Sequence, residues 1–213
     1  MRFLPIIFAM LVLGAFLYPE TRVVSTRSEG KTRTVTTEFE EVAKDGGVEV
    51  REVGEEGSLV ALLDPAGEVR SFEIRSKEAD LAMRSDGKVV TVSGTWKGKP
   101  IAGSCELKGL GYYGGGFEFA LRALARNKLA SLKFPMIRPA EPSKSTVMEL
   151  TREGVEAYKG RSAIKVKVSL AGIMSALWSA HVLVGEDGTI LRYTGNRGPG
   201  TADIVTELVE VRP

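Results

Sequence analysis

The stretch AIKVKVSL, residues 163–170, decides the fold class. Its apolar residues, from Ile164 to Leu170, alternate with Lys165, Lys167 and a serine. Alternation with a period of two is typical of an antiparallel strand that has one face in water and the other face covered. We therefore expect a mostly β protein in which one side of the sheet packs against, or encloses, another element.

Runs with the same period occur on both sides of this stretch. The clearest are RTVTTEFEEV, VEVREV, SLVALL, EVRSFEI and KVVTVSG before it, and LWSAHVLV, TILRY and ADIVTELVEV after it. Glycine, proline or aspartate separates neighbouring runs, as in hairpin connections. Within RTVTTEFEEV, we expect Glu38, Glu40 and Glu41 to be solvated. The pattern predicts a curved antiparallel sheet or half-open barrel.

One stretch breaks the period. FEFALRALARNKLASLKF, residues 117–134, favours the principal helix of this α+β protein. Its apolar helical face consists of Phe117, Leu121, Leu124 and Leu132. Glu118 and Arg122 lie four residues apart on another face and can pair. Because Lys128 falls on the apolar face, we expect the helix to plug or cover an opening in the sheet. The proline-rich FPMIRPAEPSKS that follows is expected to be a linker.

The chain begins with MRFLPIIFAMLVLGAFLYPE, in which one arginine precedes an apolar run over residues 3–18. This run is short for a helix that crosses a bilayer, and it is typical of an export signal. Two alternatives stay open: cleavage near residues 14–15, or retention as an uncleaved anchor in the inner membrane. Either alternative predicts a periplasmic location for the remainder.

The predicted division is an export signal or anchor at residues 1–20, a flexible lead-in at residues 21–34 and one open-barrel domain at residues 35–213. With 43% hydrophobic residues in 213, the chain is large enough for one buried core. Lys and Arg total 29 against 27 Asp and Glu, and no block of like charge occurs, so nucleic acid is not an expected partner.

Residues that carry catalysis or bind metals are scarce in the sequence. Cys105 is the only cysteine, and in IAGSCEL its strand parity places it on the apolar face. His181 is the only histidine, so a zinc site built from several histidines and cysteines cannot be assembled. We expect His181 to be a hydrogen-bonded structural residue rather than a base. The sequence predicts no enzyme, no catalytic residues and no bound metal.

A glycine motif precedes the helix. GLGYYG, residues 109–114, matches the G-x-G-x-x-G pattern of dinucleotide-binding turns. The βαβ alternation and the acidic residue about twenty positions on are missing, and Tyr112 and Tyr113 would crowd a pyrophosphate. We expect a flexible entry to the helix and no cofactor.

The C-terminal part carries a family resemblance. Trp178, His181, the turn GEDG, the phrase LRYTGNRGPG and the closing TEL resemble periplasmic domains of unknown function in Gram-negative bacteria. In those domains a long antiparallel sheet curls like the open barrel of lipoprotein carriers. The resemblance covers roughly residues 35–210. It implies an exported half-barrel whose concave face holds an acyl chain or a lipid-bearing partner, and it implies no chemistry.

Two hypotheses for function follow. The first is an envelope binding protein that holds a lipid or another hydrophobic molecule, with the helix as a lid and polar residues at the rim of the cavity. Its candidate ligand-binding residues are Tyr112, Tyr113, Trp178, Arg192, Tyr193 and Arg197. For each of them alone, core packing or sheet-edge solvation is the competing interpretation. The second hypothesis is a non-catalytic structural or protein-interaction module of the cell envelope, which docks a protein through a strand edge or glycine-rich loop.

Overall fold

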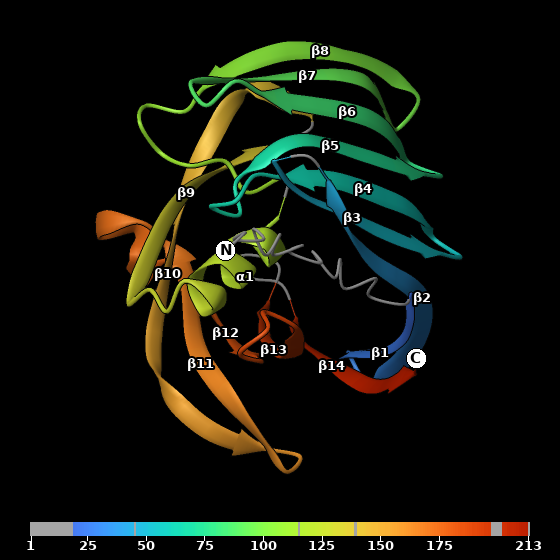
Figure 1. The fold of residues 1–213 in the computed structure, drawn as a ribbon, viewed down its shortest axis with the longest axis vertical. Coiled ribbons are helices and arrows are strands. Elements are labelled where there is room, and N and C mark those ends of the chain that lie inside the picture. Colours follow the sequence, from blue (N-terminus) through green and yellow to red (C-terminus); the bar gives the residue numbers. More distant parts are fainter. Residues whose placement is uncertain (1–18, 45, 115, 139, 197–201, 213) are drawn as a thin grey trace, which may run out of the picture.

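A computed structural model describes residues 19–44, 46–114, 116–138, 140–196 and 202–212. Within these residues, fourteen strands form a single sheet in the order β8-β7-β6-β5-β4-β3-β2-β1-β14-β13-β12-β11-β10-β9 (Figure 1). Every neighbouring pair is antiparallel, and the sheet curls into a nearly closed barrel that surrounds one α-helix. The predicted fold class is confirmed.

The first half of the sheet is β1 (Glu20–Ser28), β2 (Lys31–Lys44), β3 (Gly47–Gly54), β4 (Gly57–Leu63), β5 (Val69–Ser76), β6 (Ala79–Ser85), β7 (Val89–Trp96) and β8 (Lys99–Glu106). The α-helix α1 (Glu118–Arg126) comes next. The second half is β9 (Ser131–Arg138), β10 (Glu141–Tyr158), β11 (Arg161–Leu170), a 3-10 turn η1 (Gly172–Ala176), β12 (Ser179–Val184), β13 (Ile190–Asn196) and β14 (Asp203–Arg212).

The strands nearest the two ends of the chain pair in the middle of the sheet. In β1, Val24 lies opposite Val35 of β2 on one side and opposite Leu208 of β14 on the other. The prediction that residues 21–34 form a flexible lead-in was therefore wrong. Their side-chain pattern is weak, but β1 gains backbone hydrogen bonds from both neighbours, and these do not depend on the pattern. The predicted export signal lies outside the described residues, except for its last two.

The core lies on the concave face of the sheet. Val50, Ala61, Phe72, Met83 and Val92 face one another across five successive strands, and all are buried. Residues between them in sequence point to the convex face, as period-two alternation requires. This one-sided burial is the arrangement that the alternating runs predict.

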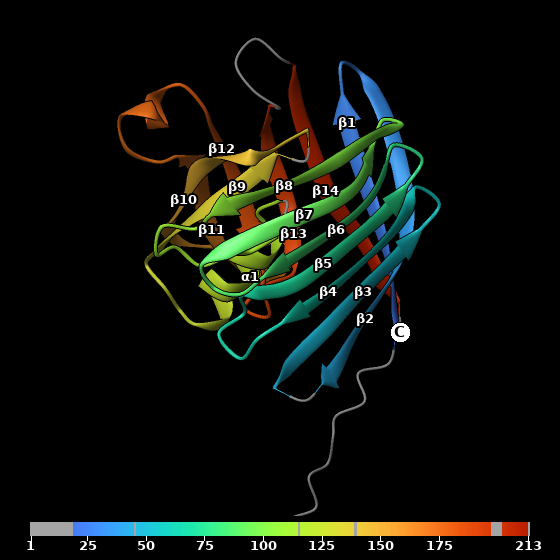
Figure 2. The ribbon, with the colours of Figure 1, turned by 90° about the horizontal axis from the view of Figure 1, so that it is seen from above.

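A close contact joins the two halves of the sheet. Gly103 of β8 packs against Pro142 at the start of β10, and a Cβ atom on Gly103 would lie 2.7 Å from the proline Cγ. Only a glycine allows this approach, because any side chain at this position would displace one strand. The barrel is therefore nearly closed where β8 passes the ends of β9 and β10 (Figure 2).

The helix is shorter than its sequence pattern predicts. It ends at Arg126, and Lys128 has a positive φ of 53°, so the chain turns before the expected last helical turn. Leu132 lies in β9 instead of on the helix, and most of the expected proline-rich linker forms β9 and β10. Pro135 is compatible with β9 because β9 is an edge strand, where one side of the backbone needs no partner.

The helix plugs one end of the barrel. Phe119 meets Phe72 of β5 edge to face, with 6.1 Å between ring centroids. Gly188, in the turn between β12 and β13, lies directly against Arg122. All seven residues from Phe119 to Ala125 are buried, so α1 is a core element and not the lid that the sequence also allowed. Among the described residues, no helix has the length and apolar character needed to cross a membrane.

Candidate functional site

The barrel has two different ends. At the plugged end lie α1 and the connections β2–β3, β4–β5 and β12–β13. At the opposite end lie the connections β1–β2, β3–β4, β5–β6 and β11–β12. The strands alternate in direction, so these two sets of connections form two opposite rims. The candidate site occupies the concave face between them.

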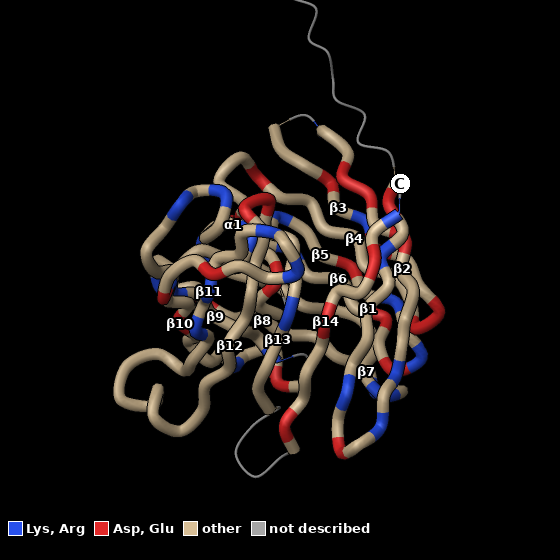
Figure 3. The backbone as a smooth tube through the Cα atoms, turned by 90° about the horizontal axis from the view of Figure 1, so that it is seen from below, with Lys and Arg blue, Asp and Glu red and all other residues tan. Residues whose placement is uncertain are grey.

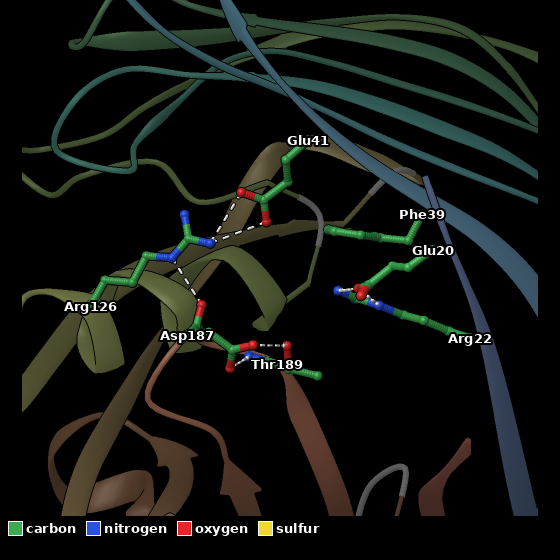
Figure 4. Close-up of a pocket in the computed structure, with 7 residues that line it drawn as sticks. All are labelled: Glu20, Arg22, Phe39, Glu41, Arg126, Asp187 and Thr189. Atoms are coloured by element: carbon green, nitrogen blue, oxygen red, sulfur yellow. Dashed lines mark hydrogen bonds and ion pairs between the residues drawn. The ribbon is translucent and has the colours of Figure 1, made fainter. Parts of the chain in front are cut away.

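A charged cluster lies where α1 meets the barrel wall (Figure 4). Glu41 of β2 is only 10% exposed, and its Oε1 is 2.5 Å from Nη1 of Arg122, a side chain that is 4% exposed. Both carboxylate oxygens of Glu41 also accept hydrogen bonds of 3.1 Å from Arg126. Arg126 further donates to the backbone oxygen of Asp187 at 2.9 Å. These contacts tie the plug helix to β2 and to the β12–β13 turn.

Two guanidinium groups in this cluster contact the same aromatic ring. The guanidinium carbon of Arg22 lies 3.4 Å from the ring centroid of Phe39, and that of Arg122 lies 5.1 Å from it. Such contacts are favourable because the ring face carries negative potential. Arg22 also donates from Nε to Glu20 at 2.7 Å. A pocket of about 190 Å³ opens beside these groups, and its lining includes Glu41 and Arg126.

Burial changes the acid–base behaviour of α1. Burial raises the pKa of Glu118, the nearby charge of Glu52 raises it further, and Arg122 and Arg22 oppose the increase. Burial also lowers the pKa of Arg122, while Glu41 acts in the opposite direction. The cluster therefore combines a pair of ions joined by a short contact with a carboxyl group that is easier to protonate than usual. Its cationic groups already contact protein carboxylates, so its clearest role is to hold the helix.

A second feature lies toward the open rim. We call it the mouth groove, a depression of about 240 Å³. Its lining residues are Val35, Thr37, Glu52, Gly54, Glu56, Gly57, Ser58, Leu59, Ile74, Arg75 and Ser76. Leu59 lies between Glu52 and Ile74 in the sheet, so strand register brings these side chains into one row. Val35, Leu59 and Ile74 are only half-buried, unlike the fully buried row nearer the plug.

Two of the predicted site residues are in the core beside the plug. Tyr112 is fully buried, and its hydroxyl lies 2.9 Å from Sδ of Met83. Tyr113 is 6% exposed and meets Phe134 edge to face at 6.0 Å. Burial raises the pKa of Tyr112 strongly and, with Glu68 and Asp64, raises the pKa of Tyr113 to about 12. Neither ring lines an entrance.

The other predicted site residues do not form one group. Tyr193 faces the barrel interior, where its ring stacks on Phe117 with 5.7 Å between centroids. Arg192 points to the opposite face, and its Nε lies 3.5 Å from Glu207. Trp178 donates from Nε1 to the backbone oxygen of Asn196 at 3.0 Å. Arg197 lies outside the described residues. Ligand contact by any of these residues stays a prediction.

Cys105 and His181, the two residues considered for catalysis, lie on opposite faces of the sheet. Cys105 is 7% exposed and packs in the core, as its strand parity predicts. His181 lies in β12 with a half-exposed side chain on the convex face, 3.5 Å from Glu153. Among the described residues, no group of three or more His, Cys, Asp or Glu side chains is arranged to hold a metal ion.

Sequence reasoning missed the charged cluster. Glu41 was expected to be solvated together with Glu38 and Glu40. However, Glu41 shares strand parity with Phe39, an aromatic residue, whereas Glu38 and Glu40 share the opposite parity. That parity was the signal that places Glu41 on the concave face. Nothing in the sequence indicated that its partner is Arg122.

No protein-family model and no curated protein matches this sequence. Among solved structures, it is similar to the β-barrel-like protein of the domain of unknown function DUF1849 from Brucella abortus. The TM-score is 0.58 at 12% identity, over 91% of this chain and 97% of that chain. The hypothetical lipoprotein YmcC from Escherichia coli matches with a TM-score of 0.42 at 10% identity, over 92% and 86%. A putative outer membrane lipoprotein-sorting protein domain from Vibrio parahaemolyticus matches with a TM-score of 0.32 at 8% identity, over 91% and 84%.

The Brucella match shows that this chain has the fold of that β-barrel-like protein, along nearly its whole length. The resemblance inferred from the C-terminal motifs is thus confirmed at the level of the fold. The other two matches, with TM-scores of 0.42 and 0.32, are too weak to show a shared fold.

Proposed function

We propose that this protein binds the apolar part of a lipid, or of another hydrophobic molecule, on the concave face between α1 and the mouth groove. One observation carries the proposal. Val35, Leu59 and Ile74 face the inside of the barrel but remain half-buried, and the groove in front of them has a volume of about 240 Å³. Protein cores are close-packed, so an apolar concave surface left partly open is typical of a binding site.

The groove also offers polar groups at suitable positions. Oγ1 of Thr37 is buried and has no hydrogen-bond partner in the structure. A buried hydroxyl without a partner is unfavourable, and a polar atom of a ligand can supply the missing hydrogen bond. Arg33 and Glu56 form an ion pair next to the groove, with both side chains more than half exposed. They supply a polar rim in place of the predicted Arg192, which lies on the convex face.

The plug helix sets the direction of entry. The buried side of α1 and its ion pairs with Glu41 close one end of the barrel. A ligand therefore enters at the mouth groove, and α1 forms the floor of the site. The proposal involves no catalysis, no cofactor and no metal, because the ligand is held by apolar burial and a few hydrogen bonds.

We further infer an exported, envelope-associated location. The support is the apolar run at residues 3–18 behind a single arginine. Cell fractionation checks the location, and mass spectrometry of the intact protein distinguishes a cleaved signal from a retained anchor. Recovery of the full-length chain in the cytoplasm would contradict the inference.

The binding proposal is tested by extracting the purified protein with organic solvent and analysing the extract by mass spectrometry. We expect a co-purifying hydrophobic molecule in stoichiometric amount. Substitution Ile74→Trp fills the mouth groove and should abolish its recovery. Val53→Trp is the matched control, because Val53 is half exposed on the convex face of β3, two strands from β5 in the same sheet.

Two outcomes would count against lipid binding. An empty extract, together with failure of the protein to enhance the fluorescence of a fatty-acid probe, would leave the concave face without a ligand. An equal loss in Ile74→Trp and Val53→Trp would place the ligand elsewhere. A defined protein partner recovered with an empty extract would favour the protein-interaction module instead.

A further inference from the structure

An uncharged apolar tip projects from the open rim. It lies in the connection between β11 and β12, where Ile173 and Met174 of the 3-10 turn η1 and Leu177, the residue that follows the turn, are exposed. Their exposed fractions are 96%, 48% and 56%. No residue of η1 is buried, and Ile173 is almost as exposed as it would be in an unfolded chain. Isolated exposed apolar residues are common on protein surfaces, but three in one short connection are not.

The surroundings extend the tip. The backbone nitrogen of Ala171 donates to the oxygen of Val147, and Val147 is itself 38% exposed. Of the seven large apolar side chains that are exposed in the described part of the chain, three belong to this connection and a fourth belongs to the β10 residue whose backbone accepts its hydrogen bond. No charged residue occurs between Val168 and Ala180, so the whole connection is uncharged in Figure 3. The hydrogen bond from Trp178 to Asn196 fixes the end of the connection to β13.

The size and shape of the tip decide what can cover it. A stable protein–protein interface buries about 800 Å² on each partner. A few side chains on a single projecting turn offer much less, so a second copy of this chain would gain too little from contact here. A protein partner would also need a pocket that matches the tip, whereas a lipid bilayer needs no matching shape.

We propose that the tip inserts into the interfacial region of a lipid bilayer. Apolar side chains next to an aromatic residue gain free energy when they leave water for this region. The lack of charge between Val168 and Ala180 complements a neutral surface, so insertion is hydrophobic and needs no anionic lipid. The tip and the mouth groove share one rim, and insertion would turn the groove toward the membrane. This inference goes beyond ligand binding and does not depend on it.

A local probe tests the proposal in the full chain. An environment-sensitive dye is attached at Ile173→Cys, with Cys105 replaced by alanine. The control carries the dye at Ser93→Cys, an exposed position on the convex face of β7. With phosphatidylcholine vesicles, we expect a blue shift at position 173 and quenching by brominated lipid, with neither effect at position 93. Because both proteins contain residues 1–18, membrane binding by that segment does not separate them.

Two further measurements complete the test. Adding phosphatidylglycerol or raising the salt concentration should leave the shift at position 173 unchanged. Introducing Met174→Asp and Leu177→Asp into the labelled protein should abolish it, while circular dichroism and solvent-extractable ligand stay the same. A dye that remains in water at position 173, an equal shift at position 93, or a strict need for anionic lipid would overturn the proposal. An empty solvent extract from a protein that shows the expected dye response at position 173 would instead contradict only the proposed function.

Discussion

Glu41 of β2 and Arg122 of α1 form an ion pair inside the barrel, and both side chains are at least nine-tenths buried. The pair connects the wall of the barrel to the helix that plugs it. Buried charges are costly to remove from water, and the cost is offset only while both partners are present. The pair therefore helps to hold α1 against β2 only while both of its charged groups are present.

Removing one partner of the pair should destabilise the fold strongly. Glu41→Gln leaves the buried guanidinium of Arg122 without its carboxylate, and we expect a loss of about 3 kcal/mol or more in the free energy of unfolding. Urea denaturation measures it. Glu40→Gln is the matched control, because Glu40 is about one-third exposed and lies 3.9 Å from Arg51. Its loss should stay below about 1 kcal/mol, and equal losses would show that the buried pair has no special role.

The stability of the protein should depend on protonation of Glu118. Burial raises the pKa of Glu118 in the folded state above its ordinary value of 4.5. The folded state therefore binds this proton more tightly than the unfolded state does. The resulting stabilisation is complete below pH 4.5 and is lost as pH rises through the folded-state pKa.

Substitution Glu118→Gln isolates this effect. We expect the variant to be more stable than the wild type at neutral pH, and the gain to shrink as pH falls toward 4.5. Chemical denaturation across this pH range measures the difference. A gain that is the same at every pH would show that the carboxyl group is not the cause.

Tyr193 of β13 makes two contacts that substitution can separate, one with the residue that precedes α1 and one within its own strand. Its ring stacks on Phe117, and its hydroxyl donates to the backbone oxygen of Asn196 at 3.0 Å. Tyr193→Phe keeps the ring and should cost about 1 kcal/mol in the free energy of unfolding. Tyr193→Ala also removes the stack and should cost about 2 kcal/mol more. Similar losses in the two variants would mean that the stack contributes little.

The contact between β8 and β10 should tolerate no side chain. Gly103→Val places new atoms where the Cγ atom of Pro142 lies, so the strands must separate, at an expected cost of about 2 kcal/mol. Ala102→Val is the control, because Ala102 is exposed on the convex face of the same strand. Hydrogen exchange should become faster in β8 for the first variant alone. Unchanged protection in β8 would show that the contact does not close the barrel.

Much of the fold follows from local patterns in the sequence. The period of AIKVKVSL predicted β11, and the GEDG turn correctly separated β12 from β13. The helix was placed correctly at its start but extended too far, because Leu132 fits a helical face and the inner face of β9 equally well. Propensity does not distinguish these alternatives, and pairing of β9 with β10 decides between them.

The candidate site was less predictable because it depends on contacts between distant residues. Arg192 and Tyr193 are neighbours in sequence, yet strand geometry sends one to the convex face and the other into the barrel. Burial of Tyr112 depends on how α1 fills the barrel, which the period of the strands does not reveal. Exposure of Ile173 depends on the fact that no other part of the described chain covers it, which is a property of the assembled molecule.

The central pairing of β1 with β14 has a consequence for the order of folding. Residues such as Val24 and Leu208 meet only after all the residues between them have been synthesised. The hairpins from β2 to β8 join sequence neighbours and can form early, but β1 lacks its second neighbour until the final strand has emerged. An incomplete chain therefore presents an unsatisfied backbone edge in the middle of its wall, where it is prone to pair with other chains.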